Sequence, residues 1–313
     1  MSESKQEQQS GNKWGRRKFV TTLITASGIV PILFNPSEVM AKSPNHTING
    51  KPFTVQQIID LILQSIPSAP FPQTVDTIKA GTGDQVVSGI ATTMFATNAV
   101  IEKAAALGVN FIIAHEPTFY NHADDTTWLQ NDEVYQHKLA LLKKRKMAVW
   151  RFHDYIHAHK PDGILMGVLT ALGWERFYNA NKPHIITIPS TPLKSVIELS
   201  KKKLGIPHVK FIGNPAQSIQ TVALIPGAAG GRMQIEAIRD DKPDLLMCGE
   251  LNEWETSEYV RDLQFMGGKA SLLVLGHIVS EEPGLEWLVK WLQPQVPDIK
   301  ITHIPSGDAF SWA

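Results

Sequence analysis

Apolar segments with the length of a strand follow helix patterns along this chain and end in side chains that can bind a metal ion. The stretch FIIAHEPTFY, residues 111–120, is the clearest case, because four apolar residues are followed directly by His115, Glu116 and Pro117. A helix pattern precedes it at residues 98–107. A short apolar run next to a helix pattern predicts a strand that is buried on both faces.

The same order of helix, strand and polar residues returns in three further units. The helix patterns lie at 134–145, 233–239 and 258–265, and the strands that follow lie at 147–152, 244–247 and 271–275. The polar residues after these strands are His153, Asp154 and His157, then Glu250, then His277 and Glu281. This alternation predicts an α/β fold whose sheets are covered by helices. Since ligands bind at the carboxyl ends of strands in such sheets, we expect these side chains to line a crevice.

Histidine and glutamate are the residue types that these strand ends share. Glu281 follows His277 by four residues, a spacing that places both on one face of a helical turn. Imidazole and carboxylate together suit Zn, Mn, Fe, Ni or Co. Each residue alone has a plainer explanation, because a strand-end histidine is more often a hydrogen-bonding residue. Glu281 alone could be a favourable charge at a helix N-terminus, and Glu250 a cap of the following turn.

Four segments resemble the hallmark segments of the Nif-three-like dinuclear metal-centre proteins, also called GTP cyclohydrolase I type 2 homologues. They are GIATTMFATNAVIEKAAALGVNFIIAHEPTFY, VWRFHDYIHAHKPDG, PDLLMCGELNEWE and LLVLGHIVSEEPGLEWLVKWL. The resemblance runs from residue 54 to the C-terminus. It implies two interlinked α/β domains with mixed sheets, a ring-shaped homo-hexamer and two divalent transition-metal ions in an internal cleft. We place the domain boundaries near residues 160–165 and 230.

The resemblance also implies a ligand set, from which this chain departs at two positions. The family's His-His-Pro motif reads His115-Glu116-Pro117 here, and His157 stands where the family has an aspartate ligand. The Gly-His-x-x-Ser-Glu motif is kept. The implied metal ligands are His115, Glu116, His157, His277 and Glu281. This set still has three histidines and two carboxylates, so we interpret the departures as changes that compensate each other. Asp154 is the alternative ligand if His157 points away.

The function stays open between three hypotheses. The first is a metal-dependent hydrolase of an unknown small molecule, in which Glu250, placed at the cleft by the resemblance, acts as base or orients a ligand. The second is a non-enzymatic metal-binding ring for storage, delivery or assembly. The third is a structural oligomer with a degenerate site, because two ligand positions have changed.

Several other functions are excluded or disfavoured by the sequence. The 30 basic and 30 acidic residues cancel and form no basic stripe, so nucleic acid is not an expected partner. Neither a Gly-x-Ser-x-Gly elbow nor a dinucleotide-binding fingerprint is present. The only cysteine, Cys248, lies in an apolar run, which predicts a buried thiol rather than a nucleophile. The glycine-rich stretch at 226–233 is predicted to be a flexible turn, not a phosphate loop. The histidines in polar or irregular surroundings are predicted to lie at the surface: His122, His137, His184 and His208.

The N-terminal segment WGRRKFVTTLITASGIVPILFNPSEVMAKS resembles a twin-arginine export signal. Arg16 and Arg17 precede a 16-residue apolar run at 19–34, which is short for a membrane span. Small side chains before Lys42 offer a cleavage site, so residues 1–41 are the predicted signal and 42–313 the metal-binding region. We therefore expect a periplasmic or otherwise exported protein that meets the membrane only during export. The alternative is an uncleaved membrane anchor.

Overall fold

The computed structural model describes residues 47–48 and 51–311, which belong to one compact unit. The predicted export signal at 1–41 lies outside the described residues and stays a prediction. Within the described ranges, no helix combines the length and the apolar character needed to cross a membrane.

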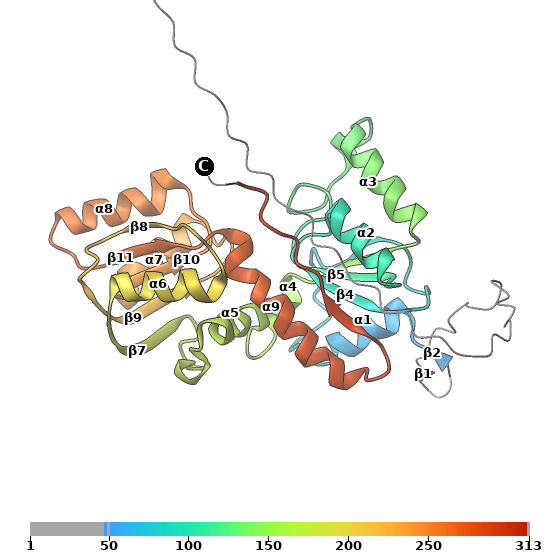
Figure 1. The fold of residues 1–313 in the computed structure, drawn as a ribbon, viewed down its shortest axis with the longest axis horizontal. Helices are drawn as coiled ribbons and strands as arrows, with labels where there is room; N and C mark the ends of the chain where they lie inside the picture. The colour runs from blue at the N-terminus through green and yellow to red at the C-terminus, as the bar shows by residue number, and fades with distance from the viewer. Residues whose placement is uncertain (1–46, 49–50, 312–313) are drawn as a thin grey trace, which may run out of the picture. The chain divides into compact units, whose positions relative to one another are not determined.

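Two mixed five-stranded sheets organise the described chain (Figure 1). The first sheet has the order β12-β4-β5-β6-β3, with strands Ile301–His303, Ile90–Thr93, Phe111–Ala114, Ala148–Arg151 and Ile78–Ala80. The second sheet has the order β7-β9-β10-β11-β8, with strands Ile185–Pro192, Ser218–Ile225, Leu245–Cys248, Ser271–Val274 and Lys210–Ile212. In both, the central strands are parallel; the second sheet has an antiparallel strand at each edge, whereas the first has one only at β3, because its other edge strand, β12, pairs in parallel with β4. The predicted α/β class with mixed sheets is therefore confirmed.

Helices alternate with these strands, as the sequence pattern predicts. They are α1 Val55–Leu63, α2 Asn98–Ala106, α3 Glu133–Lys144, α4 Asp154–Ala158, α5 Gly163–Leu172, α6 Leu193–Leu204, α7 Gly231–Asp241, α8 Glu258–Phe265 and α9 His277–Leu292. A short hairpin, β1 Thr47–Ile48 and β2 Lys51–Pro52, precedes α1. The predicted boundary at 160–165 covers the end of the α4–α5 connection and the first residues of α5, and 230 is the residue before α7, between two strands of the second sheet. Both boundaries remain predictions.

The central strands of the first sheet are buried on both faces. Every residue of β4, β5 and β6 is buried, because alternate side chains enter two different cores. Phe111, Ile113 and Trp150 pack in one core with residues of α1 and α9. Ile112 and Val149 pack in the opposite core with residues of α2 and α3. A strand enclosed in this way is a rigid element, and the residue that follows it is aimed accurately.

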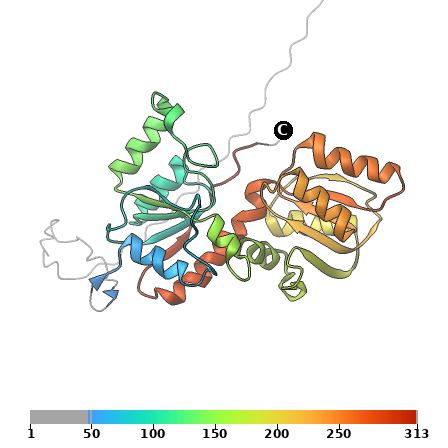
Figure 2. The ribbon, with the colours of Figure 1, turned by 180° about the vertical axis from the view of Figure 1, so that it is seen from behind.

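Helix α9 links the two sheets. It begins directly after β11 of the second sheet, and it packs against β4 and β12 of the first (Figures 1 and 2). It also packs along α5, and the two helices lie very close where Gly167 faces Gly284. A Cβ atom on Gly167 would lie 2.3 Å from the Gly284 backbone nitrogen, so only glycine permits this approach.

We predict that Gly167→Ala lowers the free energy of unfolding by about 2–3 kcal/mol, because α5 must move away from α9 to admit the methyl group. The control is Thr170→Ala on the exposed face of the same helix, which should change stability by less than about 0.5 kcal/mol. Denaturant unfolding of both variants measures the difference. Equal stability of the two variants would show that the close packing seen here is not required.

Candidate metal centre

Three strand ends supply the polar side chains of the site. His115 and Glu116 follow β5, His153 follows β6, and His277 is the first residue of α9 after β11. Strands β5 and β6 end on the same side because they pair in parallel. Helix α9 begins just after β11 and packs against the first sheet, so its first residue, His277, comes to the same place. The arrangement agrees with the expectation that these polar residues come together at the carboxyl ends of strands.

His115 is completely buried and is held by its Nδ1 atom, which lies 3.1 Å from the carbonyl oxygen of Phe152. A carbonyl only accepts a hydrogen bond, so Nδ1 carries the proton and Nε2 keeps its lone pair in the neutral ring. Among the described residues, Nε2 finds no hydrogen-bond partner, although it lies 3.3 Å from Glu281 Oε2. A buried ring nitrogen without a hydrogen bond is energetically unfavourable, and coordination of a metal ion would provide the missing interaction.

His153 and His157 are anchored in the same way. His157 Nδ1 lies 3.0 Å from Asp162 Oδ2, and His153 Nδ1 lies 3.0 Å from Asp154 Oδ1. Both carboxylates accept from Nδ1, which leaves each Nε2 atom available as a ligand. The imidazole nitrogens of His115, His153 and His157 lie within 4.8 Å of one another. These three histidines can therefore hold one ion.

The carboxylates form an adjoining group. His115, Glu116 and Glu281 also have ligand atoms within 4.8 Å of one another, and all three are buried. His277 Nε2 lies 3.0 Å from Glu281 Oε2 and 3.2 Å from Glu116 Oε1. The structure thus brings all five predicted ligands into one cluster. Their role as ligands remains a prediction.

His153 is the member of the cluster that the predicted ligand set lacks. It follows a buried strand with only Phe152 between them, and this position was the available signal. Asp154, the predicted alternative ligand, lies behind His153 instead. Its Oδ2 atom accepts hydrogen bonds from the Thr74 hydroxyl and the Val75 amide. Asp154 therefore orients a histidine rather than facing the cluster.

The charges of the cluster shift the pKa values of its histidines in opposite directions. Burial lowers the pKa of His277, but its hydrogen bonds to Glu116 and Glu281 outweigh this and raise the pKa to about 10. Burial, together with the neighbouring His115, lowers the pKa of His153 to about 4. In the metal-free protein His277 therefore holds a proton between two carboxylates, whereas His153 is a neutral donor.

Glu250 lies beside the cluster rather than in it. Its Oε2 atom is 3.4 Å from His277 Nδ1, and 55% of its side chain is exposed. A carboxylate at Nδ1 directs the opposite nitrogen, Nε2, toward Glu116 and Glu281. The position suits either predicted role of Glu250, base or orienting residue. The neighbouring Cys248 is buried as predicted, and burial raises its pKa to about 12.

The glycine-rich turn between β9 and α7 closes one side of the cluster. Gly227 has a φ of +68°, and a Cβ atom there would lie 2.0 Å from Glu281 Oε1. The amide of Gly227 donates a hydrogen bond to the hydroxyl of Ser280, 2.9 Å away. The turn thus packs its backbone against the buried carboxylate, which explains the glycine at this position.

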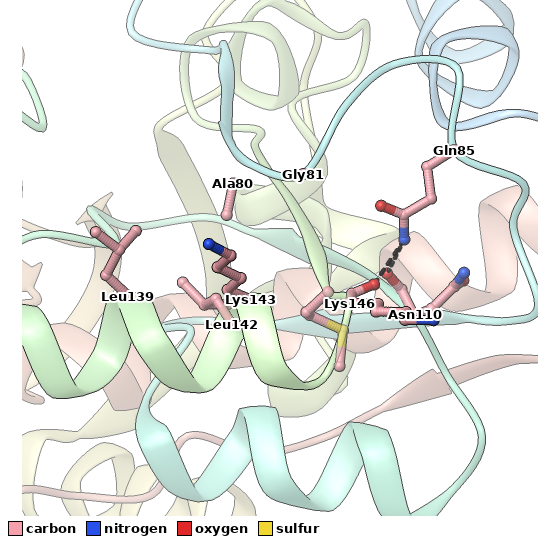
Figure 3. A pocket seen from close by; sticks show the side chains of 9 residues that line it. Ala80, Gly81, Gln85, Asn110, Leu139, Leu142, Lys143 and Lys146 are labelled. Carbon is pink, nitrogen blue, oxygen red and sulfur yellow. Dashed lines mark hydrogen bonds between the residues drawn. The ribbon is translucent and has the colours of Figure 1, made fainter.

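A separate cavity of about 490 Å³ lies at the opposite ends of β5 and β6 (Figure 3). Asn110 and Met147, the residues before these two strands, line it together with Lys143 of α3. Gln85 closes part of its wall by donating a hydrogen bond to the carbonyl oxygen of Lys146 at 2.7 Å. None of the cluster residues lines this cavity, so it is not the metal centre.

The fold and the His/Glu cluster together define an α/β protein with a candidate metal centre, and known proteins share this architecture. The Duf34/NIF3 (NGG1p interacting factor 3) family model matches residues 54–308, so the chain belongs to this family. It is 22% identical over 244 residues to a GTP cyclohydrolase 1 type 2 homolog of Pyrococcus abyssi, covering 75% of this chain and 91% of that protein.

Solved structures agree on the fold. A hypothetical protein of Staphylococcus aureus superposes with a TM-score of 0.69 at 18% identity, covering 84% of this chain and 100% of that one. A Bacillus cereus protein related to NIF3 gives a TM-score of 0.68 at 14% identity, with the same coverage. At these identities the likeness establishes the fold alone.

We predict that Asp162→Ala weakens metal binding by about 10- to 100-fold, because His157 loses the acceptor that orients it. Asp162 also caps α5 through the amides of Ile164 and Leu165, so stability should fall by about 1 kcal/mol. Asp132→Ala removes a comparable cap from α3 and is the matched control. Calorimetric titration with a divalent ion should show a loss of affinity for Asp162→Ala alone; equal affinities would contradict the assigned role.

The raised pKa of His277 predicts a pH dependence of the metal-free protein. A histidine whose pKa is raised from 6.5 to about 10 stabilises the fold fully below pH 6.5, and this contribution is lost as the pH rises toward 10. Denaturant unfolding of chelator-treated protein should show this loss, and His277→Gln should remove most of it. Parallel pH profiles for the two proteins would contradict the assignment.

Proposed function

We propose that the protein holds two divalent transition-metal ions in the His/Glu cluster and uses them to hydrolyse a small molecule. The observation that carries the proposal is the Nε2 atom of His115, which is buried at the centre of the cluster without a hydrogen-bond partner among the described residues. Zn, Mn, Fe, Ni and Co all accept the imidazole and carboxylate donors present.

The six donor residues divide naturally into two groups. His115, His153 and His157 would hold one ion through imidazole nitrogens. Glu116 and Glu281, which also lie within reach of His115, would hold the other together with His277, which contacts both carboxylates. When bound, two neighbouring ions polarise a substrate oxygen and lower the pKa of a water molecule. Glu250, which is exposed beside His277, would accept a proton or keep His277 in its orientation.

The assembly and location belong to the same proposal. The resemblance to hexameric metal-centre proteins supports a homo-hexamer, and the twin-arginine pattern at residues 14–41 supports export to the periplasm, with membrane contact only in transit. The name of the curated relatives, GTP cyclohydrolase 1 type 2 homolog, makes nucleotides a reasonable first substrate class to test. A non-enzymatic metal-binding ring remains the alternative, because the same cluster would serve it.

We predict close to two metal equivalents per chain in protein purified from the periplasm, measured by elemental mass spectrometry. His277→Ala combined with Glu281→Ala should lose at least one, because two donors of one group disappear. The matched control is Glu133→Ala with His137→Ala, an exposed pair with the same four-residue spacing on α3.

Turnover separates the two candidate functions. Hydrolysis of phosphoesters, nucleotides or cyclic amides that is lost on chelation supports the enzyme. A full metal load without turnover supports storage or delivery. A wild-type chain without metal would contradict both and leave a structural role.

A further inference from the structure

Arg151, the last residue of β6, is a completely buried cation directly behind the cluster. Its Nη2 atom lies 3.5 Å from Glu116 Oε2. Its Nε atom donates to the carbonyl oxygen of His115 at 3.3 Å, and Nη1 donates to the carbonyl oxygen of His122. The guanidinium is thus fixed on three sides, and one of these contacts is a predicted metal ligand.

The charges around Arg151 can be counted from the described residues. Asp124 Oδ2 lies 3.6 Å from Arg151 Nη1 and 3.3 Å from Lys79 Nζ, and both of these partners are buried. Lys79 therefore supplies a cation for Asp124. Glu116 is then the carboxylate that neutralises the charge of Arg151. A buried guanidinium without such a partner would be strongly unfavourable.

Glu116 divides its two oxygens between different neighbours. Oε2 faces Arg151, whereas Oε1 lies 3.2 Å from His277 Nε2 and 3.8 Å from His153 Nε2. Only Oε1 therefore points to the other donors of the cluster.

We propose that Arg151 is a positioning residue of the metal centre, which neutralises Glu116 and holds Oε2 so that only Oε1 serves as a ligand. The inference rests on the proposed metal-binding function. Glu116 and Arg151 together carry no net charge and offer one donor atom, as a neutral histidine does. The pair is thus the electrostatic equivalent of the histidine that the family motif has at this position, and His157 is not needed to balance the change.

Two explanations of Glu116 can be compared: compensation by Arg151 and compensation by His157. They differ in which second substitution restores the metal affinity that Glu116→His lowers. With Arg151 in place, the new imidazole leaves a positive guanidinium next to a divalent ion, so metal affinity should fall about tenfold or more. Arg151→Met in the same chain removes that charge and should restore affinity to within about threefold of the wild type. His157→Asp should restore less. Arg145→Met is the control, because it removes an arginine whose partner is Glu102 rather than Glu116 or Asp124.

The experiment is titration of each full-length variant with Zn²⁺ and with Mn²⁺, together with its melting temperature. Rescue by Arg151→Met that exceeds rescue by His157→Asp and by Arg145→Met supports the proposal. Equal or greater rescue by either of the others, or no rescue at all, overturns it. A wild-type protein that binds neither ion would instead overturn the proposed function, so the two failures are distinguishable.

The metal-free protein provides an independent measurement if the double variant does not fold. Arg151→Met leaves the Glu116 carboxylate buried without its cation, so adding Glu116→Gln should keep or raise the melting temperature of that variant. The alternative result is that Glu116→Gln lowers the melting temperature of the Arg151→Met variant by as much as it lowers that of the wild type. This would show that the two residues are not coupled, and would overturn the proposal.

Discussion

Two buried carboxylates impose the constraint on which the rest of the site depends. Glu116 and Glu281 are 7% and 3% exposed, and a carboxylate taken out of water is tolerated only when positive charge or strong hydrogen bonds surround it. In the metal-free protein a protonated His277 and the buried Arg151 supply this charge. A cluster that needs positive charge this strongly is suited to bind metal ions.

The fold compensates for the burial of these carboxylates by holding the histidine and glutamate side chains in place before any ion binds. Strands β5 and β6 are enclosed by two cores, so His115 and His153 leave rigid elements. Their Nδ1 atoms are held by a carbonyl oxygen and a carboxylate, which removes the freedom of the rings to turn. Helix α9 follows β11 of the second sheet, and its close packing on α5 places His277 and Glu281 beside these histidines.

Much of this arrangement could be predicted from the sequence, and the missing parts have physical causes. The continuous apolar runs of β5, β6, β10 and β11 are unmistakable, and ligands that follow such strands can be recognised. Strands β3 and β12 have three residues each and show no periodicity, so they are invisible until their partners are known. Arg151 looks like an ordinary strand residue, because its partners come from loops and strands distant in sequence.

The central claim is that His115 Nε2 is a metal ligand, and anomalous diffraction tests it most directly. Crystals of the full chain would be measured on both sides of the absorption edge of the metal found in the purified protein. The account predicts one anomalous peak about 2.0–2.2 Å from His115 Nε2 and a second among Glu116, His277 and Glu281. A map without a peak in this cluster, in crystals that contain the metal elsewhere, would contradict it.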